Sequence, residues 1–174
     1  MTIHLILGGA RSGKSSYAQT SAEQAVAVGR SLVMIATAEP FDAEMSARIA
    51  AHRSSRGPAW RTIEAPLAVA RAIASVPAQS CAVLDCLTIW LSNLMLKEAV
   101  IDDELRELER AAKAFVGDLW LVSNEVGNGL VPETPLGRAF RDASGRMNQR
   151  IAAMADDVTL VVAGLPLTLK KASP

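Results

Sequence analysis

The chain has 174 residues, of which 50% are hydrophobic and 21% are charged. A chain of this length and composition can bury the core of one compact domain, so wholesale disorder is excluded and residues 1–174 are expected to form a single domain. Lys plus Arg number 18 and Asp plus Glu also number 18, which gives a formal net charge of zero. This balance argues against a protein that binds nucleic acid non-specifically through excess positive charge.

The ends of the chain and its cysteines indicate a cytoplasmic protein. The segment Met1–Gly9 has no basic region before its apolar residues, so no signal peptide is expected. The longest apolar run, Val158–Leu169, is interrupted by a threonine, a glycine and a proline, so no membrane span is expected. Cys81 and Cys86 are too few for a disulfide framework and are predicted to be reduced, buried thiols.

Short apolar runs alternate with helical patterns along the chain. The runs predicted as strands are Ile3–Leu7, Leu32–Ala36, Trp60–Ile63, Cys81–Leu84, Leu119–Ser123, Val158–Val162 and Leu167–Lys170. The predicted helices are Lys14–Val28, Asp42–Ser54, Pro66–Ser75, Leu87–Val100, Asp102–Val116 and Pro135–Ala155. Pro66 and Pro135 suit first-turn positions, and Asp42 and Asp102 suit N-caps. The pattern predicts an α/β fold with a mostly parallel sheet and helices on both faces, which binds ligands outside the carboxyl ends of its strands.

A glycine-rich loop directly follows the first predicted strand. It consists of Gly8, Gly9, Ala10, Arg11, Ser12, Gly13, Lys14 and Ser15 and fits the pattern G-x-x-x-x-G-K-[ST]. Its glycines let backbone N–H groups surround phosphate oxygens, and the helix that follows adds its positive end. Lys14 is predicted to reach the β- and γ-phosphates of a nucleotide, and Ser15 to bind Mg²⁺. An ordinary glycine-rich turn is the less favoured alternative, because strand, loop and helix occur in the required order.

The helical pattern over Asp42–Ser54 carries a histidine between arginines. Arg48, His52 and Arg56 are four residues apart and share one helix face. A neutral imidazole can attack phosphorus while guanidinium groups hold the phosphates. On spacing alone, a surface histidine on a basic helix is the preferred interpretation. His4, within the first strand, is predicted to be a packed or hydrogen-bonded core residue.

Two further strand ends carry polar residues. Asp85 ends an apolar strand, where a carboxylate orients Mg²⁺ or its waters; the alternative is that it only caps the next helix. The segment Asn124–Glu133 follows the next strand, and its glycines and proline suggest a shaped, functional loop. Beyond it, Arg138, Arg141 and Asp142 either line a pocket or interface or form a solvated, salt-bridged face.

Together these segments resemble a known family. The resemblance rests on Gly8–Ser15, Ile35–Ala38, the stretch from Arg48 through His52 to Arg56, Trp60–Glu64, Asn124–Gly127, and Phe140–Asp142 through Gln149. In this order they resemble the bifunctional adenosylcobinamide kinase / adenosylcobinamide-phosphate guanylyltransferase of cobalamin biosynthesis. The glycine loop is common among nucleotide enzymes, whereas the combination is specific and spans nearly the whole chain.

The resemblance implies a P-loop, RecA-like fold and a two-step reaction. ATP or GTP phosphorylates adenosylcobinamide, and GMP from GTP then passes through a guanylylated histidine to adenosylcobinamide phosphate. The family's histidine falls on His52, with Lys14 as the second catalytic residue. The implied nucleotide contacts are the loop Gly8–Ser15 with Ala36, Thr37, Ala38, Arg53, Ser54, Ser55, Arg56, Glu64 and Asp85. The resemblance also implies a homotrimer, and it leaves open a small-molecule kinase without a covalent step and a nucleotide-dependent switch or assembly ATPase.

Overall fold

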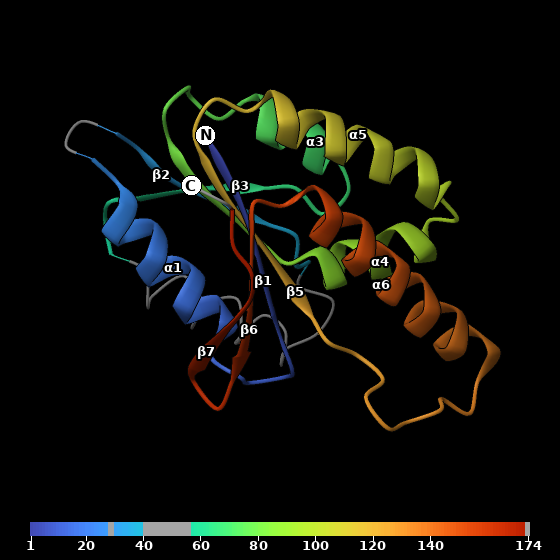
Figure 1. Ribbon diagram of the computed structural model, residues 1–174. Coiled ribbons are helices and arrows are strands. Elements are labelled where there is room, and N and C mark those ends of the chain that lie inside the picture. The colour runs from blue at the N-terminus through green and yellow to red at the C-terminus, as the bar shows by residue number, and fades with distance from the viewer. Residues whose placement is uncertain (28–29, 40–56, 173–174) are drawn as a thin grey trace.

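The computed structural model describes residues 1–27, 30–39 and 57–172, and its strands form one seven-stranded sheet (Figure 1). The strands are β1 (Thr2–Gly8), β2 (Leu32–Ala36), β3 (Trp60–Glu64), β4 (Cys81–Asp85), β5 (Asp118–Asn124), β6 (Asp157–Val162) and β7 (Leu165–Lys170). Their order across the sheet is β3-β2-β4-β5-β1-β6-β7. All neighbouring pairs are parallel except β6 and β7, so the predicted mostly parallel sheet is confirmed.

Helices cover both faces of this sheet. They are α1 (Lys14–Ala25), α3 (Val69–Ala74), α4 (Leu87–Leu96), α5 (Ile101–Ala114) and α6 (Pro135–Met154). In Figure 1, α1 lies on one side of the sheet and the other four helices lie on the opposite side. The core is divided accordingly: Ala18 and Ala22 of α1 pack with Met34 and Val83, whereas Leu108 of α5 belongs to the cluster on the other face.

The first difference between prediction and structure concerns the helix that was expected to begin at Pro66. Helix α3 begins at Val69, so Pro66 does not lie in its first turn. The carbonyl oxygen of Pro66 instead accepts a hydrogen bond of 3.0 Å from the side chain of Asn93 on α4. This tertiary contact satisfies the backbone before the helix starts, so a first-turn proline was the wrong interpretation.

A second difference concerns Asp102. The N-cap of α5 is Val100, and Asp102 lies within the first turn. Its carboxylate pairs with the guanidinium of Arg150 on α6 at 3.1 Å, so it joins two helices instead of capping one. By contrast, Pro135 does occupy the first turn of α6, where the Thr134 hydroxyl accepts a hydrogen bond from the Gly137 N–H. The predicted helix Asp42–Ser54 lies outside the described residues.

The register of the strands decides which loops meet. Gly8 of β1 lies opposite Asn124 of β5, and Asp85 of β4 lies opposite Val122 of β5. The glycine loop, the end of β4 and the loop after β5 therefore emerge at the same carboxyl edge. Cys81 and Cys86 are buried free thiols, as predicted. Among the described helices, none combines the length and apolarity needed to cross a membrane.

Candidate functional site

The glycine loop is tightly held between β1 and α1. A Cβ atom at Gly8 would meet the Val161 carbonyl oxygen at 2.6 Å, so a larger residue would displace the loop from β6. Gly13, the N-cap of α1, has a φ of 94°, a conformation that favours glycine. Lys14 is only 8% exposed, and its ammonium group donates to the Gly9 carbonyl oxygen at 3.0 Å. The fold thus places a buried cation within the curl of the loop.

The turn between β6 and β7 supports the loop from outside. The Gly164 N–H donates to the Ser12 carbonyl oxygen at 2.8 Å, and a Cβ atom at Gly13 would meet the Gly164 Cα at 3.2 Å. Gly164 itself has a φ of 80°. Sequence analysis did not connect this turn with the loop, because the two are far apart in the sequence and the pairing of β1 with β6 brings them together. The glycine at 164, between two apolar runs, was the available signal.

The end of β4 is fixed from β2. The Thr37 hydroxyl donates to the Cys86 carbonyl oxygen at 2.8 Å and accepts from the Cys86 N–H at 2.9 Å. The Asn93 side chain donates to the Thr37 carbonyl oxygen at 2.9 Å. Thr37 is fully buried, so it braces the turn after Asp85. Its predicted contact with a nucleotide stays a prediction.

Asp85 itself lies half-buried at the carboxyl edge of the sheet. The N-cap of α4 is Cys86, and no side chain makes a capping hydrogen bond to that helix, so the capping interpretation of Asp85 receives no support. Burial and the Asp85 carboxylate raise the pKa of the Cys86 thiol to about 11, which keeps the thiol neutral. Asp85 is therefore the charged group at this strand end.

Ser15 and Asp85 offer the donor atoms that a magnesium ion prefers. Ser15 lies in the first turn of α1 and is half-buried, and α1 packs against β4, whose last residue is Asp85. A hydroxyl and a carboxylate are hard oxygen ligands of the kind that bind Mg²⁺ together with waters and phosphates. The residues present fit that ion, and its binding stays a prediction.

A buried polar network joins α4, β5 and α6 beside the loop. The Ser123 hydroxyl donates to the Asn148 side-chain oxygen at 2.7 Å and lies 3.3 Å from the Thr88 hydroxyl. The Asn148 side-chain nitrogen donates to the Asn124 carbonyl oxygen at 3.1 Å and to Oε1 of Glu125 at 3.2 Å. Ser123 and Asn124 belong to β5, where they lie opposite Leu7 and Gly8 of β1. Sequence analysis missed this network, although Thr88 and Ser123 stand out as polar residues within apolar segments.

The loop after β5 is fastened to α6 by arginines. Arg138 donates to the carbonyl oxygens of Pro132 and Glu133 at 2.9 and 2.7 Å. Arg141 donates to the Leu130 carbonyl oxygen and pairs with Asp142 at 3.1 Å. The pair formed by Arg141 and Asp142 agrees with the alternative of a salt-bridged face. Both arginines also bind the backbone of the loop, which neither alternative included.

The remaining predicted residues fall into two groups. His52 and the basic run Arg53, Ser54, Ser55 and Arg56 lie outside the described residues. Ala36 ends β2 and Glu64 ends β3, paired in register at the same edge, and Ala38 follows Thr37. Arg11 is exposed within the glycine loop, with a positive φ of 56°. The described residues among the predicted nucleotide contacts therefore share one edge of the sheet.

His4 lies away from this site. It stacks on Trp120 with ring centroids 4.7 Å apart, and its Nδ1 lies 3.1 Å from a carboxylate oxygen of Asp157. Burial lowers the pKa of His4, and the carboxylates of Asp157, Asp118 and Asp156 oppose that shift. The prediction of a packed or hydrogen-bonded histidine is confirmed, although the side chain is half-buried and not fully enclosed.

Comparison with known sequences identifies relatives along nearly the whole chain. A family model described as cobinamide kinase / cobinamide phosphate guanyltransferase matches residues 4–169. The bifunctional adenosylcobalamin biosynthesis protein CobP of Pseudomonas aeruginosa is 45% identical over 169 residues, which cover 95% of this chain and 96% of the relative. The bifunctional adenosylcobalamin biosynthesis protein CobU of Salmonella typhimurium is 39% identical over 182 residues, which cover 95% and 98% of the two chains.

Comparison with solved structures concerns the fold alone. The flagellar accessory protein FlaH from Methanocaldococcus jannaschii superposes with a TM-score of 0.54 at 13% identity, over 98% of this chain and 79% of the other. The ATPase domain of G40P gives a TM-score of 0.52 at 11% identity, over 91% and 68% of the two chains. The predicted P-loop, RecA-like α/β fold is confirmed, and the structure adds the strand order, in which β5 lies between β1 and β4.

Proposed function

The chain belongs to the cobinamide kinase / cobinamide phosphate guanyltransferase family, a group of P-loop transferases in cobalamin biosynthesis, and from this premise we propose a two-step reaction. In the first step ATP or GTP phosphorylates the aminopropanol hydroxyl of adenosylcobinamide. In the second step GTP guanylylates His52, and the GMP passes to adenosylcobinamide phosphate to give adenosylcobinamide-GDP. Both steps displace a phosphate-bound leaving group, so both need a site that holds a triphosphate.

The observation that carries this proposal is the glycine loop with its buried lysine, on a chain that matches the family over residues 4–169. Lys14 is held in the curl of the loop, where a triphosphate would lie with its β- and γ-phosphates against the ammonium group. Phosphoryl transfer depends on positioning and on neutralising charge, and these are what a preorganised cation and inward-facing N–H groups supply.

Ser15 and Asp85 are the residues that would hold Mg²⁺. When bound, the ion supplies neutralisation of the charge on the phosphate oxygens. The chain's own contribution is the position of these oxygen ligands: Ser15 in the first turn of α1, and Asp85 at the end of β4, braced by Thr37.

His52 is the proposed nucleophile of the second step. A histidine intermediate divides guanylyl transfer into two in-line displacements, and the imidazole must be neutral to attack. Guanylylation should therefore decline as the pH falls below about 6.5, the ordinary pKa of histidine, and nearby arginines would shift that limit downward. Arg53 through Arg56, the proposed phosphate contacts, provide such charges.

The decisive experiment is intact mass spectrometry after incubation with GTP and Mg²⁺. We expect a GMP adduct that is labile to acid and stable to alkali, as a phosphorus–nitrogen bond should be, and its loss on addition of adenosylcobinamide phosphate. His52→Ala should abolish the adduct and the transferase step but retain the kinase step. The chain has 2 histidines, so His4→Gln is a matched control that should keep the adduct.

The results separate this function from its alternatives. An adduct on another residue, or full transferase activity in His52→Ala, would remove the covalent role of His52. Kinase turnover without any adduct would leave a small-molecule kinase. Failure to phosphorylate cobinamide at all, with nucleotide hydrolysis retained, would support a nucleotide-dependent switch.

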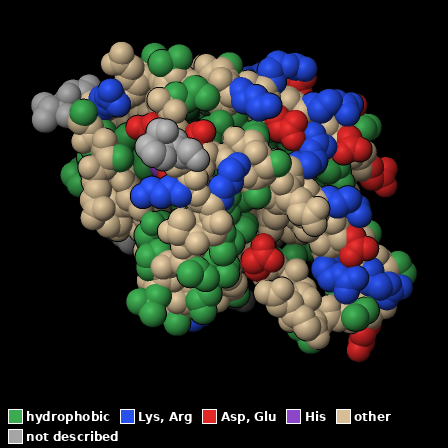
Figure 2. Space-filling model, in the orientation of Figure 1, with side chains coloured by type: hydrophobic (Ala, Val, Ile, Leu, Met, Phe, Trp, Pro, Cys, Tyr) green, Lys and Arg blue, Asp and Glu red, His purple; other side chains and the backbone are tan. Residues whose placement is uncertain are grey.

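We further propose that the protein works as a cytoplasmic homotrimer. The two free thiols support a reducing compartment. In Figure 2 hydrophobic side chains gather over the β6–β7 hairpin, where Val162, Leu165, Leu167 and Leu169 are 55–72% exposed. Such an apolar edge suits subunit contact. Light scattering should give the trimer mass, and Leu167→Glu should reduce it if this edge is the contact.

A further inference from the structure

Phosphorylating an alcohol requires an acceptor for the hydroxyl proton, and the glycine loop, Gly8–Ser15, contains no carboxylate or imidazole. We propose that Glu125 is this acceptor in the kinase step. The inference rests on the proposed function, because it concerns the reaction of the cobinamide hydroxyl. It is carried by the position of Glu125 and by the network that holds its carboxylate.

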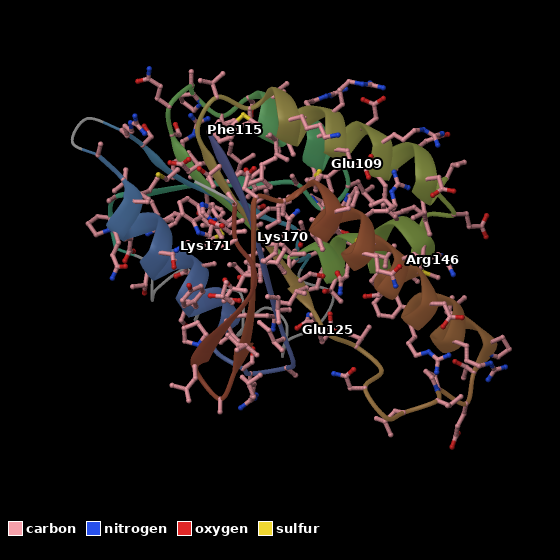
Figure 3. All side chains as sticks on the ribbon, in the orientation of Figure 1. Glu109, Phe115, Glu125, Arg146, Lys170 and Lys171 are labelled. Carbon is pink, nitrogen blue, oxygen red and sulfur yellow. The ribbon has the colours of Figure 1, made fainter. Side chains whose placement is uncertain are left out.

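The backbone of Glu125 is fixed to the glycine loop. Gly8 and Asn124 are opposite each other in the β1–β5 ladder, and the Glu125 N–H donates to the Gly8 carbonyl oxygen at 3.1 Å. Gly8 is the first residue of the loop, so Glu125 stands beside the point where the chain begins to curl. Figure 3 shows Glu125 at the carboxyl end of β5, at the edge of the sheet.

The side chain is held by one oxygen only. Asn148 donates to Oε1 of Glu125 at 3.2 Å, and the other end of the Asn148 amide accepts from the Ser123 hydroxyl at 2.7 Å. Asn148 is 7% exposed, so this pairing fixes which end of its amide faces Glu125. No residue in the described part of the chain donates a hydrogen bond to Oε2. One carboxylate oxygen is therefore positioned and the other can accept a proton.

Other acidic residues at this edge are less suited to the task. Asp85 is the proposed metal partner, and the next residue, Cys86, has a neutral thiol. Glu64 ends β3, which is separated from β1 by β2, β4 and β5. Asp142 is paired with Arg141. Among these carboxylates of the described residues, Glu125 combines contact with the loop and a positioned side chain.

The proton balance distinguishes the two steps. In the kinase step the hydroxyl oxygen forms a bond to the γ-phosphorus, and the bond from that phosphorus to the β,γ-bridging oxygen breaks, its electrons leaving with the nucleoside diphosphate. The hydroxyl proton passes to Oε2 of Glu125 and then to water. In the guanylyl step the acceptor is a phosphate oxygen, which is largely ionised near neutral pH and needs no base. Glu125 should therefore matter in one step only.

Glu125→Gln tests this division. Glutamine keeps an oxygen for the Asn148 hydrogen bond and removes the basic carboxylate, so the local fold should survive. We expect kcat for cobinamide phosphorylation to fall by about 10²- to 10⁴-fold, the usual contribution of a general base. KM for the nucleotide and the rate of GMP transfer from GTP to cobinamide phosphate should change by less than about threefold, because neither uses the proton acceptor. Glu133→Gln, the same change at an exposed position of the same loop, should leave both steps as in the wild type.

The possible results separate this inference from the function on which it rests. Wild-type protein that does not phosphorylate cobinamide would overturn both. Wild-type turnover with a Glu125→Gln rate within about twofold of it would overturn the role of Glu125 alone. Equal losses in the two steps would also overturn it, since they would indicate nucleotide binding or folding. Partial kinase activity in Glu125→Asp, which keeps the carboxylate but shortens its reach, would support it.

Discussion

The two edges of the sheet differ in how their charged and polar groups are paired. At the amino edge several groups satisfy one another: the His4 ring pairs with Asp157, the Asp156 carboxylate accepts from the Ile3 N–H at 2.7 Å, and the Lys170 ammonium donates to the last carbonyls of α6. The buried Ser80 hydroxyl, just before β4, is an exception and has no hydrogen-bond partner among the described residues. At the carboxyl edge, polar groups are held in place while some of their hydrogen-bonding positions remain open. Among described residues, the buried Ser12 hydroxyl has no hydrogen-bond partner and Oε2 of Glu125 accepts no bond.

The described residues also line a cleft near the amino edge of the sheet. This cleft, of about 570 Å³, is lined by residues that include His4, Asp118 and Trp120, from the first halves of β1 and β5, and Tyr17 of α1. Two of its charged groups are held within the protein: Asp157 pairs with His4, and Lys170 donates to carbonyl oxygens at the end of α6. The comparison teaches that a polar group is available for a ligand or for chemistry when the protein uses only some of its hydrogen-bonding positions. The following substitutions test that contrast.

Lys14→Ala should produce the largest effect, because it removes the preorganised cation of the carboxyl edge. We expect triphosphate binding to weaken and kinase turnover to fall by about 10²-fold or more, the range found when one positioned electrostatic group is lost. Steady-state kinetics and nucleotide titration measure both. Lys113→Ala, on the exposed face of α5, is the matched control and should be silent. Near-normal kinase activity in Lys14→Ala would remove the glycine loop from the mechanism.

Asp85→Asn should come next. It keeps the size of the side chain and removes its charge, so the metal dependence should change more than the fold. We expect turnover to fall by about 10- to 100-fold at limiting Mg²⁺, since one carboxylate ligand is lost, and to recover partly at high Mg²⁺. A magnesium titration of activity measures this. Unchanged dependence on Mg²⁺ together with normal turnover would exclude Asp85 as the metal partner.

Asn148→Ala tests the support beneath the carboxyl edge. It leaves the Ser123 hydroxyl without its acceptor and the Asn124 carbonyl without its donor, so the free energy of unfolding should fall by about 1–3 kcal/mol. Urea denaturation measures the change. Asn128→Ala, in the exposed part of the loop after β5, should change stability by less than about 0.5 kcal/mol. Equal stability of the two variants would show that the network is not needed for the fold.

The sequence predicted most of the fold and the main part of the described site. Continuous apolar runs predicted strands such as Leu32–Ala36, and a short residue pattern predicted the glycine loop. Both features could be predicted because each depends on residues that are neighbours in the sequence. Predictions of helix starts were wrong where a tertiary contact overrode a local preference. Asp102 pairs with Arg150 instead of capping α5, and the Pro66 carbonyl oxygen accepts a hydrogen bond from Asn93. The Thr88–Ser123–Asn148 network was missed because its members come from three separate elements, and only the packing of α4 and α6 against β5 unites them.

His4 gives the smallest expected effect and probes the amino edge. Burial lowers its pKa below the ordinary value of 6.5, against the opposing carboxylates of Asp157, Asp118 and Asp156. As the pH falls below 6.5, the unfolded chain takes up a proton before the folded one does, so this residue reduces stability between that pH and the lower pKa of the folded state, and contributes no such loss above it. His4→Gln removes the titration. Urea unfolding at pH 7.5 and pH 5.5 should show the wild type losing more stability than the variant, by less than about 1.4 kcal/mol, the equivalent of one pKa unit. Equal losses would mean that the imidazole at the amino edge is not constrained by its surroundings, and the contrast between the two edges would lose its support there.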